Sequence, residues 1–345
     1  MKNKQFEKYV KSENNLNAVK FICAILVILH HSYPITFGPD YIDPFKRITN
    51  SQFSLGNFSV IIFLFIAGML ITMSFVKIKD YKKFFIKRIT RIFPSLVVVI
   101  LLTVFVIGPV FTNIDVKKYF TSINTYKYLI FNCILITNHN LTVFTNNIYN
   151  LSPNGSLWTL PVEFCCYIII IILNLFKLLK EKIVKYYPIL IMAIYLCQSI
   201  VIKYIGGFWP AVQAILFFGM GIYIYLFFNE SNFSKKGFLI SLVLLIVSLV
   251  LNIYSYINIL LIPYIIIYIT FFIKKKFKRL NNLGKYSYEI YLTGFLIQQC
   301  VSNIFNSYIK SPYFNFILSV PIIIILSIVI HRFVDVVLKK FKLII

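Results

Sequence analysis

The chain has 345 residues, of which 59% are hydrophobic and only 13% are charged, and its mean hydropathy is +0.82. Soluble domains are about half apolar and about one-quarter charged, so this composition excludes both an ordinary soluble protein and a disordered chain. The formal net charge of +24 comes from short basic tracts between apolar runs, which is typical of membrane topology rather than of nucleic-acid binding. We therefore predict a multi-pass protein of the cell membrane, with the lipid bilayer and no nucleic acid among its partners.

Ten apolar runs are long enough, or nearly so, to cross a bilayer, and they predict an all-α transmembrane helical bundle. They cover residues 16–31, 57–76, 92–111, 157–176, 186–202, 208–228, 238–254, 258–273, 286–303 and 315–331. With both termini in the cytoplasm, the inner segments hold 28 basic residues and the outer segments hold 7. Counting the short run 128–137 as a further span would reverse this bias, to 14 inside and 21 outside. The sequence therefore predicts about ten spans, cytoplasmic termini and a single membrane-embedded domain over residues 1–345.

The first span carries Lys20, His30 and His31, and ionisable residues are costly inside a membrane and indicate function. Lys20 and His31 have ten residues between them, so on a helix they lie within about 20° of one azimuth and about 16 Å apart. The stripe between them is modest in size (Cys23, Ala24 and Val27), which predicts a narrow groove with polar ends. The alternative is that Lys20 snorkels to the cytoplasmic surface and His31 lies in the wet interface. The other faces carry bulky, lipid-compatible side chains, namely Phe21, Ile25, Leu26, Ile28 and Leu29.

A basic segment, Lys87–Pro94, follows the second span on the predicted cytoplasmic side. If it is helical, Lys87 and Arg91 are four residues apart and Arg88 and Arg91 are three apart, so the cations converge. Arginine pairs suit bidentate binding of phosphate. The alternatives are plain positive-inside charge and contact with anionic lipids.

The largest outer segment, residues 112–156, is rich in Asn and Thr, which suits either a sugar-facing surface or a solvated loop. Just beyond it, Glu163 is the only acidic side chain near the outer end of a span, two residues after Pro161. We interpret Glu163 as facing the same outer cavity as His31 and orienting or charging that imidazole. The alternative is that Glu163 only completes a helix start, where a carboxylate is favoured.

Neither a metal site nor a disulfide framework is predicted. The six cysteines lie in apolar runs, and no CxxC pair or Cys/His ligand spacing appears.

Five segments, in this order, resemble motifs of the acyltransferase family 3 membrane proteins, which include O-acyltransferases of bacterial surface glycans. They are Asn17–His31, Phe63–Leu70, Lys87–Pro94, Leu157–Phe164 and Leu283–Leu292. Three departures stand out. Asn17 replaces an acidic residue often found early in the first motif, Ala67 replaces the serine before the second-span glycine, and Gly294 replaces a histidine after the Tyr-Leu pair.

The resemblance implies transfer of an acyl group, acetyl above all, from cytoplasmic acyl-CoA to a hydroxyl of a cell-surface or lipid-linked glycan. Acetyl-CoA is then a donor substrate, and no permanently bound cofactor is expected. The anionic CoA is expected to dock on Arg88 and Arg91, with Lys87 and Lys20 as further contacts. Its pantetheine arm is long enough to cover the rise of about 16 Å to His31.

In this scheme His31 acts as a general base on the acceptor hydroxyl with help from Glu163, and a covalent acyl-histidine step is the mechanistic rival. Two other functions stay open. A glycan or lipid-linked sugar transporter would move its substrate without acyl-CoA and would usually show an internal repeat, which the sequence lacks. Gly206-Gly207 and Gly219-Met220-Gly221 are nevertheless expected to mark local helix breaks. A non-catalytic envelope assembly partner would leave acetylation normal when deleted.

Overall fold

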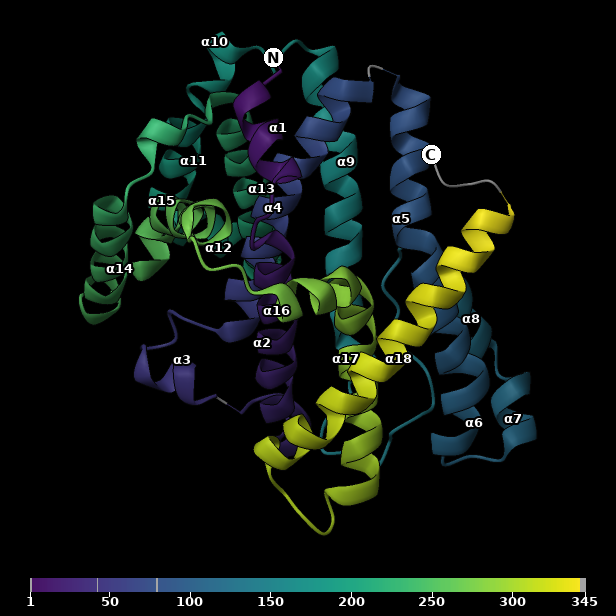
Figure 1. Cartoon of the computed structure of the whole chain (residues 1–345). Helices are drawn as coiled ribbons and strands as arrows, with labels where there is room; N and C mark the ends of the chain where they lie inside the picture. The colour runs from purple at the N-terminus through teal and green to yellow at the C-terminus, as the bar shows by residue number, and fades with distance from the viewer. Residues whose placement is uncertain (1, 42, 79, 342–345) are drawn as a thin grey trace. The chain divides into compact units, whose positions relative to one another are not determined.

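The computed structural model describes residues 2–41, 43–78 and 80–341, and these residues form helices and no strands (Figure 1). The chain divides into two compact units, each assembled from three separate stretches. Unit 1 comprises residues 1–23, 44–84 and 162–284, and unit 2 comprises residues 24–43, 85–161 and 285–345. Three helices continue from one unit into the other, namely α2 (Leu16–Phe37), α5 (Tyr81–Leu102) and α9 (Thr159–Leu175). The prediction of a single domain stays a prediction.

The centre of unit 1 is a close pair of helices, α4 (Leu55–Ile78) and α13 (Trp209–Phe227). Gly68 of α4 and Gly221 of α13 face each other, and a Cβ at either position would meet backbone atoms of the other helix. The glycine of the second-span signature therefore has a packing role, since only a missing side chain lets the two backbones approach this closely. The remaining helices of the unit are α1 (Lys4–Lys11), α3 (Pro44–Ile48), α10 (Glu181–Val184), α11 (Tyr187–Leu196), α12 (Gln198–Ile205), α14 (Lys235–Val250), α15 (Tyr254–Ile267) and α16 (Lys278–Leu283).

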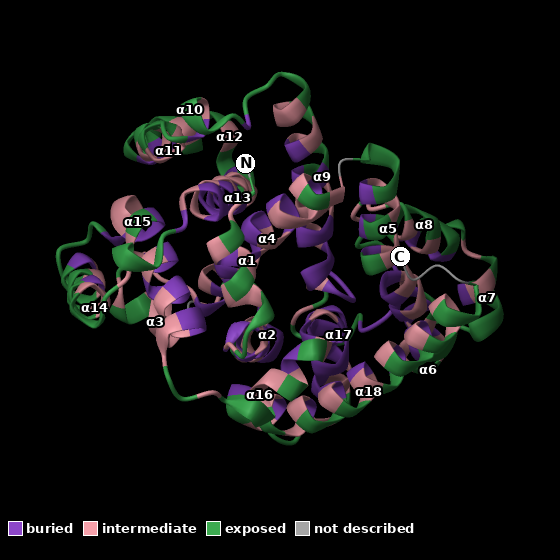
Figure 2. Ribbon diagram, turned by 45° about the horizontal axis from the view of Figure 1, so that its top comes forward, coloured by how far each residue is buried: buried purple, intermediate pink, exposed green. Residues whose placement is uncertain are grey.

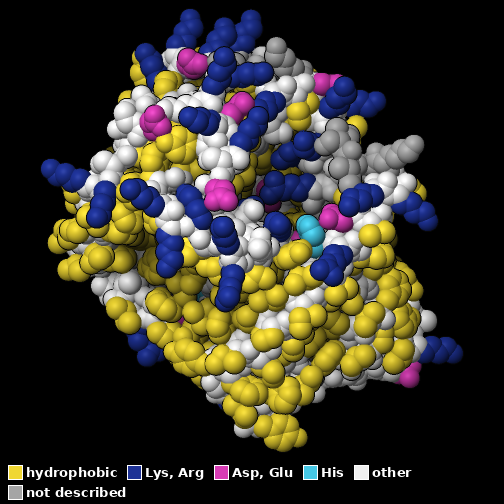
Figure 3. All heavy atoms as spheres, in the orientation of Figure 1, with side chains coloured by type: hydrophobic (Ala, Val, Ile, Leu, Met, Phe, Trp, Pro, Cys, Tyr) yellow, Lys and Arg dark blue, Asp and Glu magenta, His cyan; other side chains and the backbone are white. Residues whose placement is uncertain are grey.

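The outer surface of α14 is apolar, as a lipid-facing helix requires. Hydrophobic side chains cover it in the space-filling view (Figure 3). The exposed ones are Leu239, Ile240, Val243, Leu244, Ile246, Val247 and Val250.

Asparagine side chains hold the first turn of α2 within unit 1. Asn281 of α16 accepts a hydrogen bond from the Ala18 amide (2.8 Å) and donates one to the Asn14 carbonyl (2.9 Å). Asn15, which is fully buried, donates to the carbonyls of Ile269 and Lys275. The Ala18 amide is one of the N–H groups that a helix start leaves unpaired, and the other bonds join the chain before it to α16 and to the segment after α15. The beginning of α2 is therefore fixed.

Unit 2 is built around α17 (Ser287–Phe305), which is buried along most of its length (Figure 2). The long helix α18 (Pro312–Lys340) packs against it. A π-helical stretch, Thr103–Ile107, and α6 (Gly108–Phe111) extend α5. The outer segment then folds as α7 (Val116–Thr121), α8 (Ile123–Cys133) and an irregular loop that ends at a 3₁₀ turn, Gly155–Trp158.

Seven described helices are long and apolar enough to cross a membrane. They are Leu16–Phe37, Leu55–Ile78, Tyr81–Phe111, Gly155–Leu175, Gln198–Phe227, Tyr254–Phe272 and Pro312–Lys340. Each coincides with a predicted span. The short run at 128–137 overlaps the last part of α8 and continues beyond its end at Cys133. Helix α8 has 11 residues and extends only about 16 Å, which is too short to cross a membrane.

The other three predicted spans differ in length or composition. Helices α14 and α17 lie where spans were predicted, but α14 has only 16 residues and α17 is polar. The run 186–202 is not one helix, because it divides at Cys197 into α11 and α12. The break predicted at Gly206-Gly207 is confirmed, with Gly206 at a φ of +49° that an L side chain rarely adopts. The break predicted at Gly219-Met220-Gly221 is wrong, because these residues lie inside α13, where Gly221 packs against α4. The count of ten spans stays a prediction.

We expect Gly221→Val to destabilise the protein, because the added side chain must displace the α4 backbone. The expected loss is about 1–3 kcal/mol or more, measured as a lower unfolding midpoint of the purified protein in detergent. Gly207→Ala is the matched control, since a Cβ there meets no atom within 4 Å. Equal midpoints for the two variants would contradict the close crossing of α4 and α13.

Candidate functional site

His31 lies on α2 against an aromatic ring of α17. Its imidazole meets the Phe295 ring edge to face, with 5.0 Å between ring centroids. Its Nδ1 is buried and has no hydrogen-bond partner among the residues that the structure describes. Burying a polar atom without a hydrogen-bond partner costs free energy. This nitrogen is therefore available for a hydrogen bond with a ligand.

A buried amide fixes α2 beside α17 at the level just before His31. Gln298 of α17 donates to the Ile28 carbonyl (2.9 Å) and to Asn315 Oδ1 of α18 (3.1 Å). One turn earlier, a Cβ at Gly294 would lie 3.0 Å from Ile28 Cγ1. A histidine at position 294, the family's usual residue, would therefore require Ile28 to move. Gly294 lets the two helices pack closely and leaves His31 facing Phe295.

The predicted small-residue stripe of α2 is turned into the protein. Cys23, Ala24 and Val27 are 2%, 0% and 3% exposed. The assignment of all bulky side chains of this helix to lipid was wrong for Phe21 and Ile28, which are 8% and 1% exposed. Ile28 is buried because it fills the space that Gly294 leaves on α17.

The basic segment after the second span, Lys87–Pro94, is helical, which is the condition under which its cations lie on neighbouring turns. It lies in the middle of α5, within unit 2. Lys87 and Arg91 are exposed, whereas Arg88 is only 5% exposed. Seven residues separate Arg88 from Ser95, so the two lie on one face of α5 about 10 Å apart along its axis.

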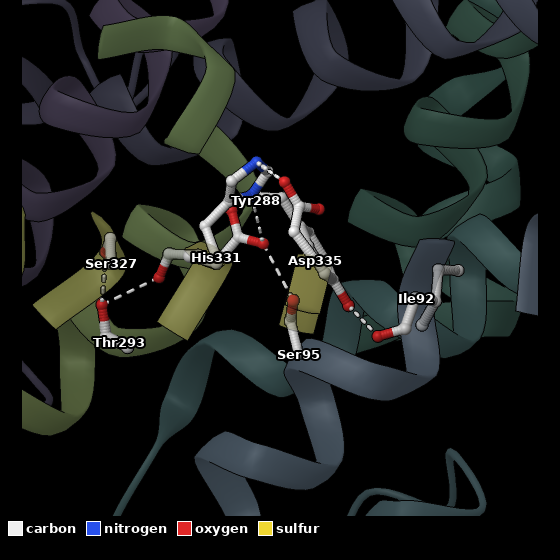
Figure 4. Close-up of polar contacts among 8 residues, drawn as sticks. Ile92, Ser95, Tyr288, Thr293, Ser327, His331 and Asp335 are labelled. Atoms are coloured by element: carbon white, nitrogen blue, oxygen red, sulfur yellow. Dashed lines mark hydrogen bonds and ion pairs between the residues drawn. The ribbon is translucent and has the colours of Figure 1, made fainter. Parts of the chain in front are cut away.

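That face of α5 leads to a buried carboxylate that the sequence analysis did not single out. Glu289 of α17 is 4% exposed and accepts a hydrogen bond from Ser95 Oγ at 2.8 Å. Its Oε1 also lies 3.2 Å from His331 Nδ1 of α18, and His331 Nε2 lies 3.7 Å from Asp335. Figure 4 shows these side chains converging from α5 and α18. The cluster joins three helices of unit 2 at the end that carries the arginines.

Neighbouring hydrogen bonds extend the same contact. Tyr288 Oη donates to the Ile92 carbonyl at 2.9 Å, and Thr293 Oγ1 contacts Ser327 Oγ at 3.2 Å (Figure 4). The Tyr286 ring packs edge to face on His331.

Helix α17 thus connects the basic end of unit 2 to His31. Phe295 follows Glu289 by six residues, which is about 9 Å along the axis. The contact of Ser95 with Glu289 therefore joins the face of α5 that carries Arg88 to the helix that carries Phe295.

The other two predicted site residues belong to unit 1. Lys20 lies on α2, eleven residues before His31, so the rise of about 16 Å between them is set by one continuous helix. Glu163 lies in the first turns of α9 and accepts a 2.5 Å hydrogen bond from Tyr167 Oη. The partnership of Glu163 with His31 stays a prediction.

The beginning of α9 is nevertheless tied to α17 within unit 2. Thr159 Oγ1 donates to Tyr291 Oη (2.9 Å), which donates to the Ser156 carbonyl (3.2 Å). Two of the family-like segments, Leu157–Phe164 and Leu283–Leu292, therefore meet. Position along the sequence gave no sign of this contact.

The outer segment folds over the far half of α17. Gln299 donates to the carbonyls of Tyr149 and Ser152, both at 2.9 Å, and accepts from Asn147 Nδ2 at 2.7 Å. The Tyr149 ring meets the Phe295 ring edge to face, with 5.3 Å between centroids. Phe295 is therefore shared between His31 and the outer loop.

Comparison with known proteins identifies the family. The profile described as "Acyltransferase domain" matches residues 13–332, so the chain belongs to acyltransferase family 3, as the motifs indicated. Its apolar helices and this membership make it a multi-pass membrane protein.

A curated relative, described as an O-acetyl transferase of Shigella phage Sf6, is 32% identical over 157 residues. The alignment covers 45% of this chain and 44% of the relative, so it spans less than half of the relative's length. No solved structure is significantly similar to the chain.

Three residues around this site carried different signals in the sequence. Glu289 was detectable, because it is an acidic residue within a predicted span. Its pairing with His331 was not, because 42 residues separate them. Phe295 carried no signal, since it is one of 35 phenylalanines.

Replacing Glu289 with Ala removes the acceptor for Ser95 and the neighbour of His331 in a buried setting. We expect a loss of about 1–3 kcal/mol, seen as a lower unfolding midpoint in detergent. Glu289→Gln keeps an acceptor oxygen and is expected to lose less. Glu13→Ala, at an exposed glutamate, is the control and should leave the midpoint unchanged. A midpoint for Glu289→Ala equal to that of Glu13→Ala would show that the cluster does not stabilise unit 2.

Proposed function

We propose that the protein is an O-acetyltransferase of the cell membrane that moves an acetyl group from cytoplasmic acetyl-CoA to a hydroxyl of a cell-surface or lipid-linked glycan. The observation that carries the proposal is that unit 2 alone contains His31 and the Arg88–Arg91 face, connected by α17. The family and the described activity of the phage relative support the acetyl-transfer chemistry.

The donor would be held by its charge at one end. Arg88 and Arg91 suit bidentate contact with the CoA phosphates, and Lys87 and Lys20 add further positive charge. Arg88 is buried, so it meets a phosphate in a setting where charge is poorly screened. The pantetheine arm would run from there to His31, along the buried small-residue face of α2.

The proposed chemistry uses His31, whose Nδ1 has no hydrogen-bond partner among the described residues. His31 accepts the proton of the glycan hydroxyl as its oxygen attacks the thioester carbonyl, and a carbon–oxygen bond forms. The carbon–sulfur bond breaks, and the CoA thiolate leaves and receives the proton from His31. Glu163 would stabilise the imidazolium that exists between these two proton transfers. In the rival path the imidazole itself takes the acetyl group before the hydroxyl attacks.

The His31→Ala variant should lose acetyl transfer by at least about 100-fold, the usual contribution of a general base, at matched membrane abundance. The measurement is acetate bound to surface glycan after expression in cells. His30→Ala is the matched control, because His30 faces Asp43 Oδ2 at 3.4 Å rather than Phe295. Retained acetylation in His31→Ala would reject the assignment, and glycan export without any acyl-CoA requirement would instead indicate a transporter.

Joint replacement of Arg88 and Arg91 by Gln should weaken acetyl-CoA binding at least about tenfold, because charge-assisted hydrogen bonds contribute about 1.5–3 kcal/mol each. Binding is measured by calorimetry on the purified protein, and the unfolding midpoint reports whether the fold is kept. Lys203→Gln removes an exposed lysine from another helix and should bind normally. Normal acetyl-CoA affinity in the double variant would place the donor site elsewhere.

A further inference from the structure

The outer loop, residues 134–154 of the outer segment, contains a histidine and a serine that take no part in the proposed acetyl transfer. His139 Nδ1 lies 2.7 Å from Ser152 Oγ, and the Asn154 amide donates to that same oxygen at 3.2 Å. Ser152 is 3% exposed, whereas His139 is exposed at the loop surface. One side of the imidazole is therefore held by the protein and the other is open.

The hydrogen bonds around Ser152 favour one tautomer of the His139 ring. The Ser152 oxygen already accepts from the Asn154 backbone N–H, and its own hydroxyl proton is then available to His139 Nδ1. In this tautomer the imidazole proton is on Nε2. Desolvation lowers the pKa of His139, which keeps the ring neutral at pH 7. The loop thus presents a fixed, uncharged N–H donor.

This donor belongs to the same framework as His31. Gln299 of α17 holds the Ser152 and Tyr149 carbonyls, and it follows Phe295 by four residues, on the same helix face. Phe295 contacts the Tyr149 ring on one side and His31 on the other. The side-chain Nδ2 of Asn154 also donates to the Leu292 carbonyl of α17, at 2.8 Å.

The surroundings of His139 favour a neutral, hydroxyl-rich ligand. No Asp, Glu, Lys or Arg occurs between Lys127 and Glu163. The exposed polar side chains of the loop are amides and a hydroxyl, namely Asn140, Thr145, Asn146 and Asn150. Such groups exchange hydrogen bonds with sugar hydroxyls without the desolvation cost of a charge.

We propose that His139, held by Ser152, and the half-buried ring of Tyr149 form a subsite that binds a neutral saccharide of the acceptor glycan next to His31. The inference rests on the proposed acetyltransferase function. In it, His139 Nε2–H donates to a saccharide oxygen and Tyr149 offers an apolar ring surface. His139 binds and orients the acceptor and takes no part in the proton transfers.

The test is steady-state kinetics of the full-length protein in detergent, with labelled acetyl-CoA and the de-O-acetylated surface polysaccharide of the producing cell as substrates. His139→Ala should raise the acceptor KM about threefold to tenfold, as expected for one lost hydrogen bond. The acetyl-CoA KM and kcat should not change. His139→Gln should restore the wild-type KM, since its amide both accepts from Ser152 and donates outward. Ser152→Ala should raise the acceptor KM less than His139→Ala does.

Thr121→Ala, at an exposed position of the same outer segment, is the matched control and should keep the wild-type acceptor KM. An unchanged acceptor KM in His139→Ala, or equal losses for donor and acceptor, would overturn the subsite. Failure of His139→Gln to restore the KM would also overturn it. A wild-type protein that transfers no acetyl group at all would instead refute the proposed function, so the two failures are distinguishable.

Discussion

The need to pair the polar side chains of α17 organises unit 2. This helix buries a carboxylate and several amides and hydroxyls, and each unpaired polar group in such an interior costs about 1–3 kcal/mol. Glu289 Oε1 accepts from Ser95 of α5, the Gln298 amide donates to α2 and α18, and Gln299 bonds to the outer loop. The partners fix the positions of four other segments, so α17 acts as the frame on which the candidate site is assembled.

The frame has two different ends. The end near Glu289 receives the arginine face of α5, and the end near Gln299 receives an uncharged, amide-rich loop. His31 and Phe295 lie between them. The proposed donor carries anionic phosphates and the proposed acceptor carries neutral hydroxyls, so the two ends of the frame differ in the same chemical sense as the two proposed substrates.

The sequence predicted most of the helices because apolar runs and loop charges report directly on membrane partition. It also predicted that Arg88 and Arg91 share a helical segment, since residues three apart are neighbours on a helix. Helical spacing assigned faces within α2 correctly for the small residues, and wrongly for Ile28. The wrong face follows from Gly294, because the periodicity of one helix does not reveal a gap on another.

Side-chain contacts between helices could not be predicted from the sequence, because the periodicity of one helix does not reveal which residues of another helix it meets. Glu289 and His331, Gln299 and Ser152, and Phe295 and His31 meet only after folding. Small residues in a sequence do not show whether they line a groove or pack against another helix. The structure gives the glycine of the second-span signature a packing role at the crossing of α4 and α13 and leaves the stripe on α2 beside His31.

The most direct test of the account is the mass balance of the reaction catalysed by the purified protein in lipid vesicles. Acetyl-CoA labelled in the acetyl carbonyl is supplied with glycan, and CoA thiol release and ester formation on the glycan are followed together by nuclear magnetic resonance. We expect one ester for each thiol released, with neither product formed by protein that lacks the His31 imidazole. Thiol release without a matching ester, or ester formation that persists without that imidazole, would contradict the account.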